Sequence, residues 1–314
     1  MDQIKKFSRK VFKSGSAQQA CFPEGIKELH PCPNAVVDVC FIHGLTGDRE
    51  KTWTANGNKK SWPELLLPTR LPNARILTWG YDAYLMRVSR ASENCLTDHA
   101  TNLLTDLTND RSAKQASSRG LIFVAHSLGG LVCKEAILMS RNNPESHLKC
   151  IFQHTKAIAF MGTPHKGSWI ADWTKIPIDT LGVVKSINTK LHSVLRTQDS
   201  YLSSLHDRFC NLLRDLPVND HRRLHVTCFY EELGMTGYGK IVSKESATFD
   251  GYSLLSIRAD HKDMVRFAEG NNGFERLAGE LLRWTGELDE VSLGKHMVVR
   301  DSPQERILAS SDGM

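Results

Sequence analysis

The chain has 314 residues, of which 40% are apolar and 24% are charged, a composition typical of soluble globular proteins. Its formal net charge is +5, but five basic residues against one aspartate within residues 1–13 supply +4 of that charge. The rest of the chain is almost neutral, so we expect no nucleic-acid partner. No apolar run approaches the roughly 18 residues that would span a bilayer.

Residues 1–20 form a basic segment in which Ile4, Phe7 and Val11 recur at helical spacing. Such a segment predicts peripheral membrane contact, or a mitochondrial presequence because it is poor in acidic residues. A plain terminal extension explains the pattern equally well. We therefore treat residues 1–29 as a basic amphipathic extension that precedes the folded domain.

From residue 30 onwards, apolar strands alternate with segments of helical spacing. This alternation predicts one α/β domain over residues 30–285, with a mostly parallel sheet that is covered by helices on both faces. The expected strands are Val36–Ile42, Arg75–Trp79, Leu121–His126, Ala157–Met161 and Leu224–Tyr230. The expected helices are Trp62–Leu67, Leu96–Leu107, Leu128–Ser140, Asp263–Phe267 and Phe274–Trp284.

Two segments depart from this alternation. Residues of about 165–222 contain no convincing strand but several apolar residues at helical spacing, and a single crossover needs far fewer residues. We interpret this segment as a helical lid, with ordinary crossover helices as the alternative. Residues 286–314 are polar, and we expect them to form a C-terminal tail.

The most informative motif is the serine that follows the expected strand Leu121–His126. Ser127 is flanked at two positions on either side by the small residues Ala125 and Gly129. A strand that turns sharply into a helix through a serine is the nucleophile elbow of α/β-hydrolases, in which bulky residues at these two positions would clash. The alternative is an ordinary strand-to-helix connection with an N-capping serine.

A serine nucleophile needs donors for the oxyanion that forms when it attacks a carbonyl. In α/β-hydrolases one donor lies in the loop after an early strand, and the other is the residue after the nucleophile. The glycine-rich run that follows Val36–Ile42 therefore predicts the backbone N–H of Leu45, or of Gly44, together with that of Leu128. We expect His43 to shape this loop rather than to titrate in catalysis.

The order nucleophile, acid, histidine places the base late in the chain. His261 follows a short apolar segment and is the best placed of the thirteen histidines. His126 is expected to project away from Ser127, and His165 falls in a loop at the same edge of the sheet. We regard His43, Gly44, His126 and His165 as possible pocket residues.

The acid should end the strand that precedes the base, where it would fix the tautomer of His261 and stabilise its imidazolium form. The strand Leu224–Tyr230 runs directly into two glutamates. Glu231 is the first of them and is the predicted acid. Glu232 is the alternative.

These runs also carry a family resemblance over roughly residues 35–285. The sequence resembles a family of serine esterases of unknown function. That family includes a serine active site-containing protein of mitochondria-associated membranes and the hydrolase domains of fungal NACHT and ankyrin-repeat proteins. The matching runs are Phe41–Gly47, Pro72–Asp82, the serine motif, Met161–Ser168, Phe229–Glu231 and Ala259–His261. The resemblance implies an α/β-hydrolase that cleaves esters, including lipid esters, with Ser127 and His261 as nucleophile and base.

The sequence thus predicts a carboxylic ester hydrolase that acts on a small-molecule or lipid ester or thioester through an acyl-enzyme. An acyltransferase with the same triad, or a hydrolase-fold binding module with little turnover, are the alternatives. The eight cysteines show no metal-ligand spacing, so we expect no metal and no cofactor. With no secretory signal and no N-glycosylation site, we expect an intracellular protein, either cytoplasmic or associated with a mitochondrion or membrane.

Overall fold

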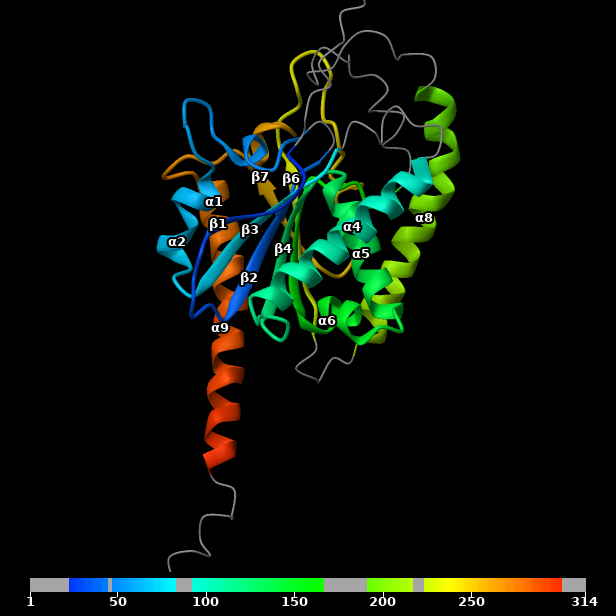
Figure 1. Ribbon diagram of the computed structural model, residues 1–314. Helices are drawn as coiled ribbons and strands as arrows, with labels where there is room; N and C mark the ends of the chain where they lie inside the picture. Colours follow the sequence, from blue (N-terminus) through cyan, green and yellow to red (C-terminus); the bar gives the residue numbers. More distant parts are fainter. Residues whose placement is uncertain (1–22, 45–46, 83–91, 167–190, 217–222, 301–314) are drawn as a thin grey trace, which may run out of the picture.

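The computed structural model describes residues 23–44, 47–82, 92–166, 191–216 and 223–300, of which 92–95, 191–200 and 288–300 are described by their helical backbone alone. A seven-stranded sheet runs through it in the order β1-β3-β2-β4-β5-β6-β7 (Figure 1). Only β1 pairs antiparallel within this sheet. The strands are β1 (Gly25–His30), β2 (Val37–Ile42), β3 (Ala74–Gly80), β4 (Gly120–His126), β5 (Thr155–Met161), β6 (His225–Glu231) and β7 (Ser253–Ile257).

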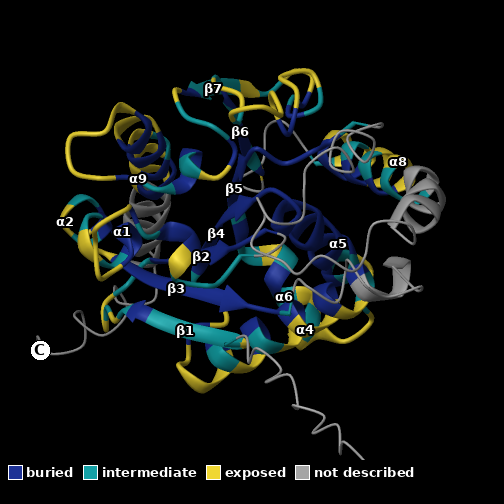
Figure 2. Cartoon of the chain, turned by 90° about the horizontal axis from the view of Figure 1, so that it is seen from above, coloured by how far each residue is buried: buried dark blue, intermediate teal, exposed yellow. Residues whose placement is uncertain are grey.

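Helices cover both faces of the sheet, which confirms the predicted fold class. Helices α4, α5, α6 and α8 lie on one face, and α1, α2 and α9 lie on the other (Figure 2). Their bounds are α1 (Trp62–Leu65), α2 (Leu67–Arg70), α4 (Ser92–Ala113), α5 (Gly129–Asn142), α6 (Ser146–His154), α8 (Leu191–Asp215) and α9 (Asn272–Arg300). Two short 3₁₀ turns, η1 (Lys51–Trp53) and η3 (Asp263–Val265), complete the elements that concern the site.

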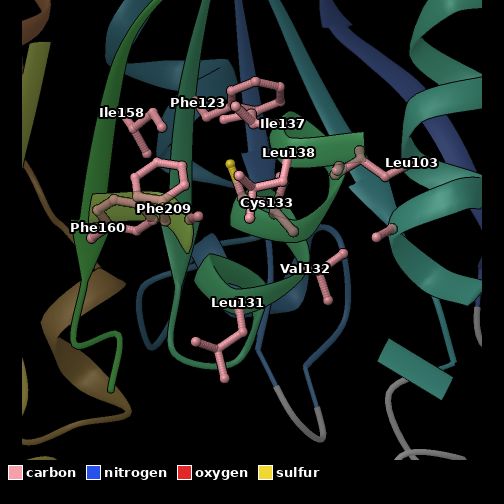
Figure 3. Close-up of a cluster of buried hydrophobic side chains, with 14 of the residues drawn as sticks. Leu103, Phe123, Leu131, Val132, Cys133, Ile137, Leu138, Ile158, Phe160 and Phe209 are labelled. Carbon is pink, nitrogen blue, oxygen red and sulfur yellow. The ribbon is translucent and has the colours of Figure 1, made fainter. Parts of the chain in front are cut away.

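The central strands are buried along their whole length, because helices cover them on both sides. Every residue of β2, β3 and β4 is buried, which explains why these segments read as near-continuous apolar runs. The side chains of β4 and β5 meet those of α5 in a close-packed core, which fixes the start of α5 against the end of β4 (Figure 3). The members that Figure 3 labels on these elements are Phe123, Leu131, Val132, Cys133, Ile137, Leu138, Ile158 and Phe160.

The structure moves the N-terminal boundary of the domain. The edge strand β1 covers residues 25–30 and pairs with β3, although the sequence assigned residues 25–29 to the extension. Within β1 only Leu29 is buried. An edge strand buries few side chains, so its sequence lacks the apolar run that identified the central strands. Residues 1–20, the predicted membrane segment, lie outside the described residues.

The C-terminal end also differs from the expectation. Helix α9 does not end at Trp284 but continues to Arg300, into the segment expected to be a tail, and its later turns project beyond the sheet (Figure 1). No proline lies between Asn272 and Pro303, so no helix-breaking residue of this kind ends the helix earlier. In contrast, the expected helix Asp263–Phe267 is only the 3₁₀ turn η3.

The predicted lid over residues 165–222 is described only in part. Helix α8 occupies Leu191–Asp215 and packs against α5 and α4 through its later residues. This agrees with the helical spacing seen in the sequence. Residues 167–190 and 217–222 lie outside the described residues, so the lid remains a prediction.

An ion cluster closes the amino-terminal edge of the sheet, opposite the end where Ser127 lies. Asp38, the second residue of β2, is fully buried and accepts hydrogen bonds from three arginines. They are Arg75 on β3, Arg111 on α4 and Arg119 just before β4. Because a buried carboxylate is costly unless it is paired, this cluster ties two strands and a helix together.

A second buried charge-bearing group lies on α5. Lys134 is fully buried, and its Nζ is 4.6 Å from the ring centroid of Phe249, with Phe160 and Phe209 next nearest. Among the described residues Nζ has no hydrogen-bond partner. Burial lowers the pKa of Lys134 to about 7, because the ammonium form loses its hydration.

This lysine predicts a pH-dependent stability. The unfolded chain holds the proton up to about pH 10.5, whereas the folded chain releases it near pH 7. The unfolded state therefore binds more protons in this window, and the free energy of unfolding rises with pH by up to about 1.4 kcal/mol per unit. Lys134→Met should lose that rise, as measured by urea unfolding from pH 7 to pH 10. Exposed Lys149→Met is the matched control, and a wild-type minus Lys134→Met difference that is constant with pH would contradict the expectation.

Candidate active site

Ser127 occupies the sharp turn between β4 and α5. Its φ is +54°, a left-handed conformation that non-glycine residues rarely adopt and that costs about 1–3 kcal/mol. The serine N–H donates to the carbonyl of Met161 at 2.9 Å, which ties the turn to the end of β5. The side chain is buried, yet it lies at the carboxyl ends of the strands, where open α/β sheets place their ligands.

The residues around this turn are small because the backbone segments approach closely. A Cβ on Gly129 would lie 2.3 Å from the carbonyl oxygen of His43, and a Cβ on Gly44 would lie 2.7 Å from the Cβ of Ser127. Both distances are shorter than any real contact, so neither position accepts a side chain. The small residues of the motif therefore let the loop after β2 pack directly against the serine.

The predicted base reaches the serine. His261 follows β7 and precedes η3, and its Nε2 lies 3.0 Å from the Oγ of Ser127. The histidine is buried. The two residues are 134 positions apart in sequence, and they meet because β4 and β7 end at the same edge of the sheet.

The first glutamate, rather than the second, lies against this histidine. Glu231 is the last residue of β6, and its Oε2 lies 3.2 Å from the Nδ1 of His261. Its Oε1 accepts the backbone N–H of Val242 at 2.9 Å. The backbone N–H of Glu232 donates to the carbonyl of Ile257 on the neighbouring strand. Among the described residues, the carboxylate at His261 is that of Glu231.

One of the two predicted oxyanion donors can be placed. Leu128 directly follows the serine at the start of α5, and among the described residues its N–H has no hydrogen-bond acceptor. That leaves the N–H available to a ligand. Leu45 lies outside the described residues, whereas Gly44, the alternative, lies against the side chain of Ser127.

His43 is held in one neutral form by its contacts. Its Nδ1 donates to the carbonyl of Gly44 at 2.9 Å, and its Nε2 accepts the backbone N–H of Tyr81 at 3.3 Å. The ring also stacks on the ring of Tyr81. Burial lowers the pKa of His43 to about 4, because the imidazolium would lose its hydration. These contacts support the role in loop shape that the sequence suggested.

The other two candidate pocket histidines are also buried, but they lie in different surroundings. His165 packs edge-on against Phe160 and Phe249, and burial lowers its pKa well below 6.5. Its ring therefore belongs to the aromatic cluster around Lys134. His126 does not simply point away from the site, because its Nε2 lies 3.0 Å from the backbone oxygen of His261.

Two residues of the site were not singled out from the sequence. Gly162, just after β5, lies so close to His261 that a Cβ there would be 3.0 Å from the Cε1 of the ring. The second is Val242, which holds Glu231 through its backbone N–H. Every residue except proline has a backbone N–H, so the sequence could not identify Val242 as a donor. Gly162, in contrast, falls in one of the runs that carried the family resemblance.

No group of three or more histidine, cysteine or acidic side chains in the described part of the chain is arranged to hold a metal ion. The six cysteines described there are free thiols. Within the same residues, no helix has both the length and the apolar character to cross a membrane.

Comparison with models of protein families gives a match that covers most of the folded domain. A family described as "Putative serine esterase (DUF676)" matches residues 37–230, more than half of the sequence. The chain belongs to this family. The matched range holds Ser127 and nearly all of β6, whereas Glu231 and His261 lie beyond it.

Several curated proteins are similar in sequence. Protein SERAC1 of Danio rerio is 27% identical over 272 residues, which cover 78% of this chain and 39% of that protein. Protein SERAC1 of Homo sapiens is 25% identical over 237 residues, which cover 66% of this chain and 36% of that protein. The chain therefore spans less than two fifths of the length of these relatives.

Among solved structures, a lipase and an esterase are similar to the chain over most of its length, at low sequence identity. The Bacillus licheniformis lipase BlEst2 in its propeptide form has a TM-score of 0.47 and 18% identity, covering 82% of this chain and 53% of that one. An inhibited esterase B from Lactobacillus rhamnosis has a TM-score of 0.47 and 12% identity, covering 84% of this chain and 79% of that one.

The contact at Gly162 predicts a specific defect. Gly162→Ala should push the ring of His261 away from Ser127, since Gly162 has a φ of +57° and the added Cβ would meet the ring and the sulfur of Met264. We expect a fluorophosphonate to label Ser127 about 10- to 100-fold more slowly, as a displacement near 1 Å would produce. The rate is measured by quenching the reaction with a fluorescent fluorophosphonate at a series of times.

Gly270→Ala is the matched control for this experiment. Gly270 has a similar φ of +75°, but nothing lies within 4 Å of its added Cβ. It should lose stability through backbone strain while keeping the labelling rate. Equal labelling rates for the Gly162→Ala and Gly270→Ala variants would show that the contact with His261 is unimportant.

Proposed function

We propose that this chain is a serine hydrolase that cleaves carboxylic esters through a covalent acyl-enzyme, with Ser127 as nucleophile, His261 as base and Glu231 as acid. The observation that carries the proposal is the chain of contacts from the Oγ of Ser127 to the two ring nitrogens of His261 and on to Glu231. Membership of a serine esterase family supports the same reaction class.

In the first half of the reaction, the Nε2 of His261 takes the proton of the Ser127 hydroxyl as Oγ attacks the ester carbonyl. A serine hydroxyl is a poor nucleophile without such a base, and a distance of 3.0 Å suits the transfer. The carbonyl oxygen becomes an oxyanion, to which the N–H of Leu128 and an N–H of the loop after β2 donate. His261 then returns the proton to the leaving alcohol as the C–O bond breaks.

In the second half, water replaces the alcohol. His261 removes a proton from water, the hydroxide attacks the acyl carbon, and Ser127 leaves with that proton as the carboxylic acid is released. The carboxylate of Glu231, whose Oε2 lies 3.2 Å from Nδ1, favours the proton on Nδ1 of His261, so that Nε2 faces the serine, and it stabilises the imidazolium. Because Glu231 is fully buried, its charge acts on His261 with little screening by water.

The Val242 contact explains how the glutamate is oriented. With Oε1 bonded to the N–H of Val242, Oε2 is the oxygen that faces His261. The segment between β6 and β7 thus folds back over the end of β6 and fixes the rotation of the carboxylate. The acid is therefore held by its own strand and by the connection that follows it.

Covalent labelling tests the nucleophile without knowledge of the natural substrate. The wild type should react with a fluorophosphonate and hydrolyse p-nitrophenyl acetate, whereas Ser127→Ala should lose both activities because it lacks the attacking oxygen. Exposed Ser203→Ala is the control, and mass spectrometry of the labelled peptide identifies the site. Labelling of Ser127→Ala at the wild-type level would refute the assignment.

The acid is tested by Glu231→Gln, whose amide oxygen can still accept the N–H of Val242. Its amide N–H₂ would then face Nδ1 and favour the wrong tautomer of His261, so kcat should fall by about 10³- to 10⁴-fold. Glu232→Gln is the matched comparison and should stay within a few-fold of wild type. If Glu232→Gln loses the activity and Glu231→Gln keeps it, the acid is Glu232.

A further inference from the structure

His126 is a buried histidine beside the proposed nucleophile for which the mechanism gives no role. It is the last residue of β4, and its Nε2 lies 3.0 Å from the backbone carbonyl oxygen of His261. The two rings lie 4.9 Å apart between centroids. Since a carbonyl oxygen can only accept, the Nε2 of His126 carries the proton and donates it to this bond.

The surroundings of His126 keep its ring neutral. Burial is the main cause, and the neighbouring charge of His261 adds to it, so that the pKa of His126 lies well below 6.5. A neutral ring can donate the hydrogen bond without placing a second positive charge beside His261. This matters because His261 itself becomes an imidazolium when it takes the serine proton.

Two consecutive residues, His126 and Ser127, therefore contact His261 at two different atoms. The Oγ of Ser127 contacts the Nε2 of its ring, and the Nε2 of His126 bonds its backbone oxygen. Within the turn around His261, Oδ1 of Asp260 accepts the N–H groups of Lys262 and Asp263. The His126 bond links this turn directly to β4, the strand that leads into the proposed nucleophile.

We propose that His126 is a positioning residue, whose Nε2–H fixes the backbone of His261 so that the base stays within reach of Ser127. The proposal rests on the proposed function, since it concerns the same site. His126 acts through His261 and does not touch the reacting atoms. A rigid link is valuable here because a displacement of about 1 Å between base and nucleophile costs about 100-fold in rate.

Two substitutions separate the hydrogen bond from the packing of the ring. His126→Phe keeps an aromatic ring but has no N–H, whereas His126→Gln places an N–H donor about as far from the backbone as Nε2 of histidine. His147 lies on α6 with an exposed side chain, and His147→Phe is the matched control for the substitution itself.

The experiment measures the rate and the final stoichiometry of fluorophosphonate labelling of the full chain, together with kcat and KM for p-nitrophenyl acetate. His126→Phe should be labelled about 10- to 100-fold more slowly, reach the wild-type stoichiometry, and lose kcat with little change in KM. His126→Gln should recover most of the lost rate, and His147→Phe should match the wild type. This pattern would support a positioning role, because a folding defect lowers the stoichiometry instead of the rate.

Several outcomes would overturn the proposal. They are a wild-type rate in His126→Phe, a His126→Gln variant as slow as His126→Phe, or a loss confined to the labelling stoichiometry. A wild type that is not labelled at all would overturn the proposed function and the positioning role together, so the two failures are distinguishable.

A measurement on the unaltered protein covers the case in which His126→Phe does not fold. Ring-nitrogen NMR of histidine-labelled protein reports which nitrogen of each ring bears the proton. Between pH 6 and 8 we expect His126 as the Nε2–H tautomer, with a slowly exchanging proton. An Nδ1–H tautomer at His126, with no proton on Nε2, would contradict the hydrogen bond and with it the proposal.

Discussion

The left-handed backbone of Ser127 is the constraint on which the site depends. At φ +54° the chain leaves β4 and enters α5 within two residues, so the serine lies at the end of the sheet instead of within a strand or helix. This conformation is unfavourable for serine and persists only because its surroundings fix it. The buried core between β4, β5 and α5 holds both sides of the turn in place.

Parallel pairing brings the other members of the site to the same turn. Strands β4, β5, β6 and β7 are neighbours in the sheet, and all end at one edge. Ser127, Gly162, Glu231 and His261 follow or end these strands in that order. Gly162 leaves room for the ring of His261 to lie between the serine and the glutamate. The ion cluster of Asp38 lies at the opposite end of the strands, so its charges are separated from those of the site.

The histidines at the carboxyl ends of the strands differ in the groups that their rings contact. His126 precedes Ser127, and His43 lies in the loop that packs against the serine turn. In both residues burial lowers the pKa, and the ring nitrogens bond backbone groups. His261 contacts a side-chain hydroxyl on one nitrogen and a carboxylate on the other, which is the arrangement that can move a proton. The partners of each ring, more than its distance from the serine, distinguish the proposed base His261 from His43 and His126.

Local sequence determined the strongly patterned parts of this protein: the buried parallel strands, the serine turn with its small neighbours, and the order of serine, glutamate and histidine. It missed β1, whose edge position leaves most side chains partly exposed, and it ended α9 too early because polar residues can continue a helix. Only the tertiary structure placed Glu231, and not Glu232, against His261, and placed His126, Gly162 and Val242 nearby. Those assignments depend on which atoms meet across strands far apart in sequence, and a linear pattern of residue types carries no record of such distances.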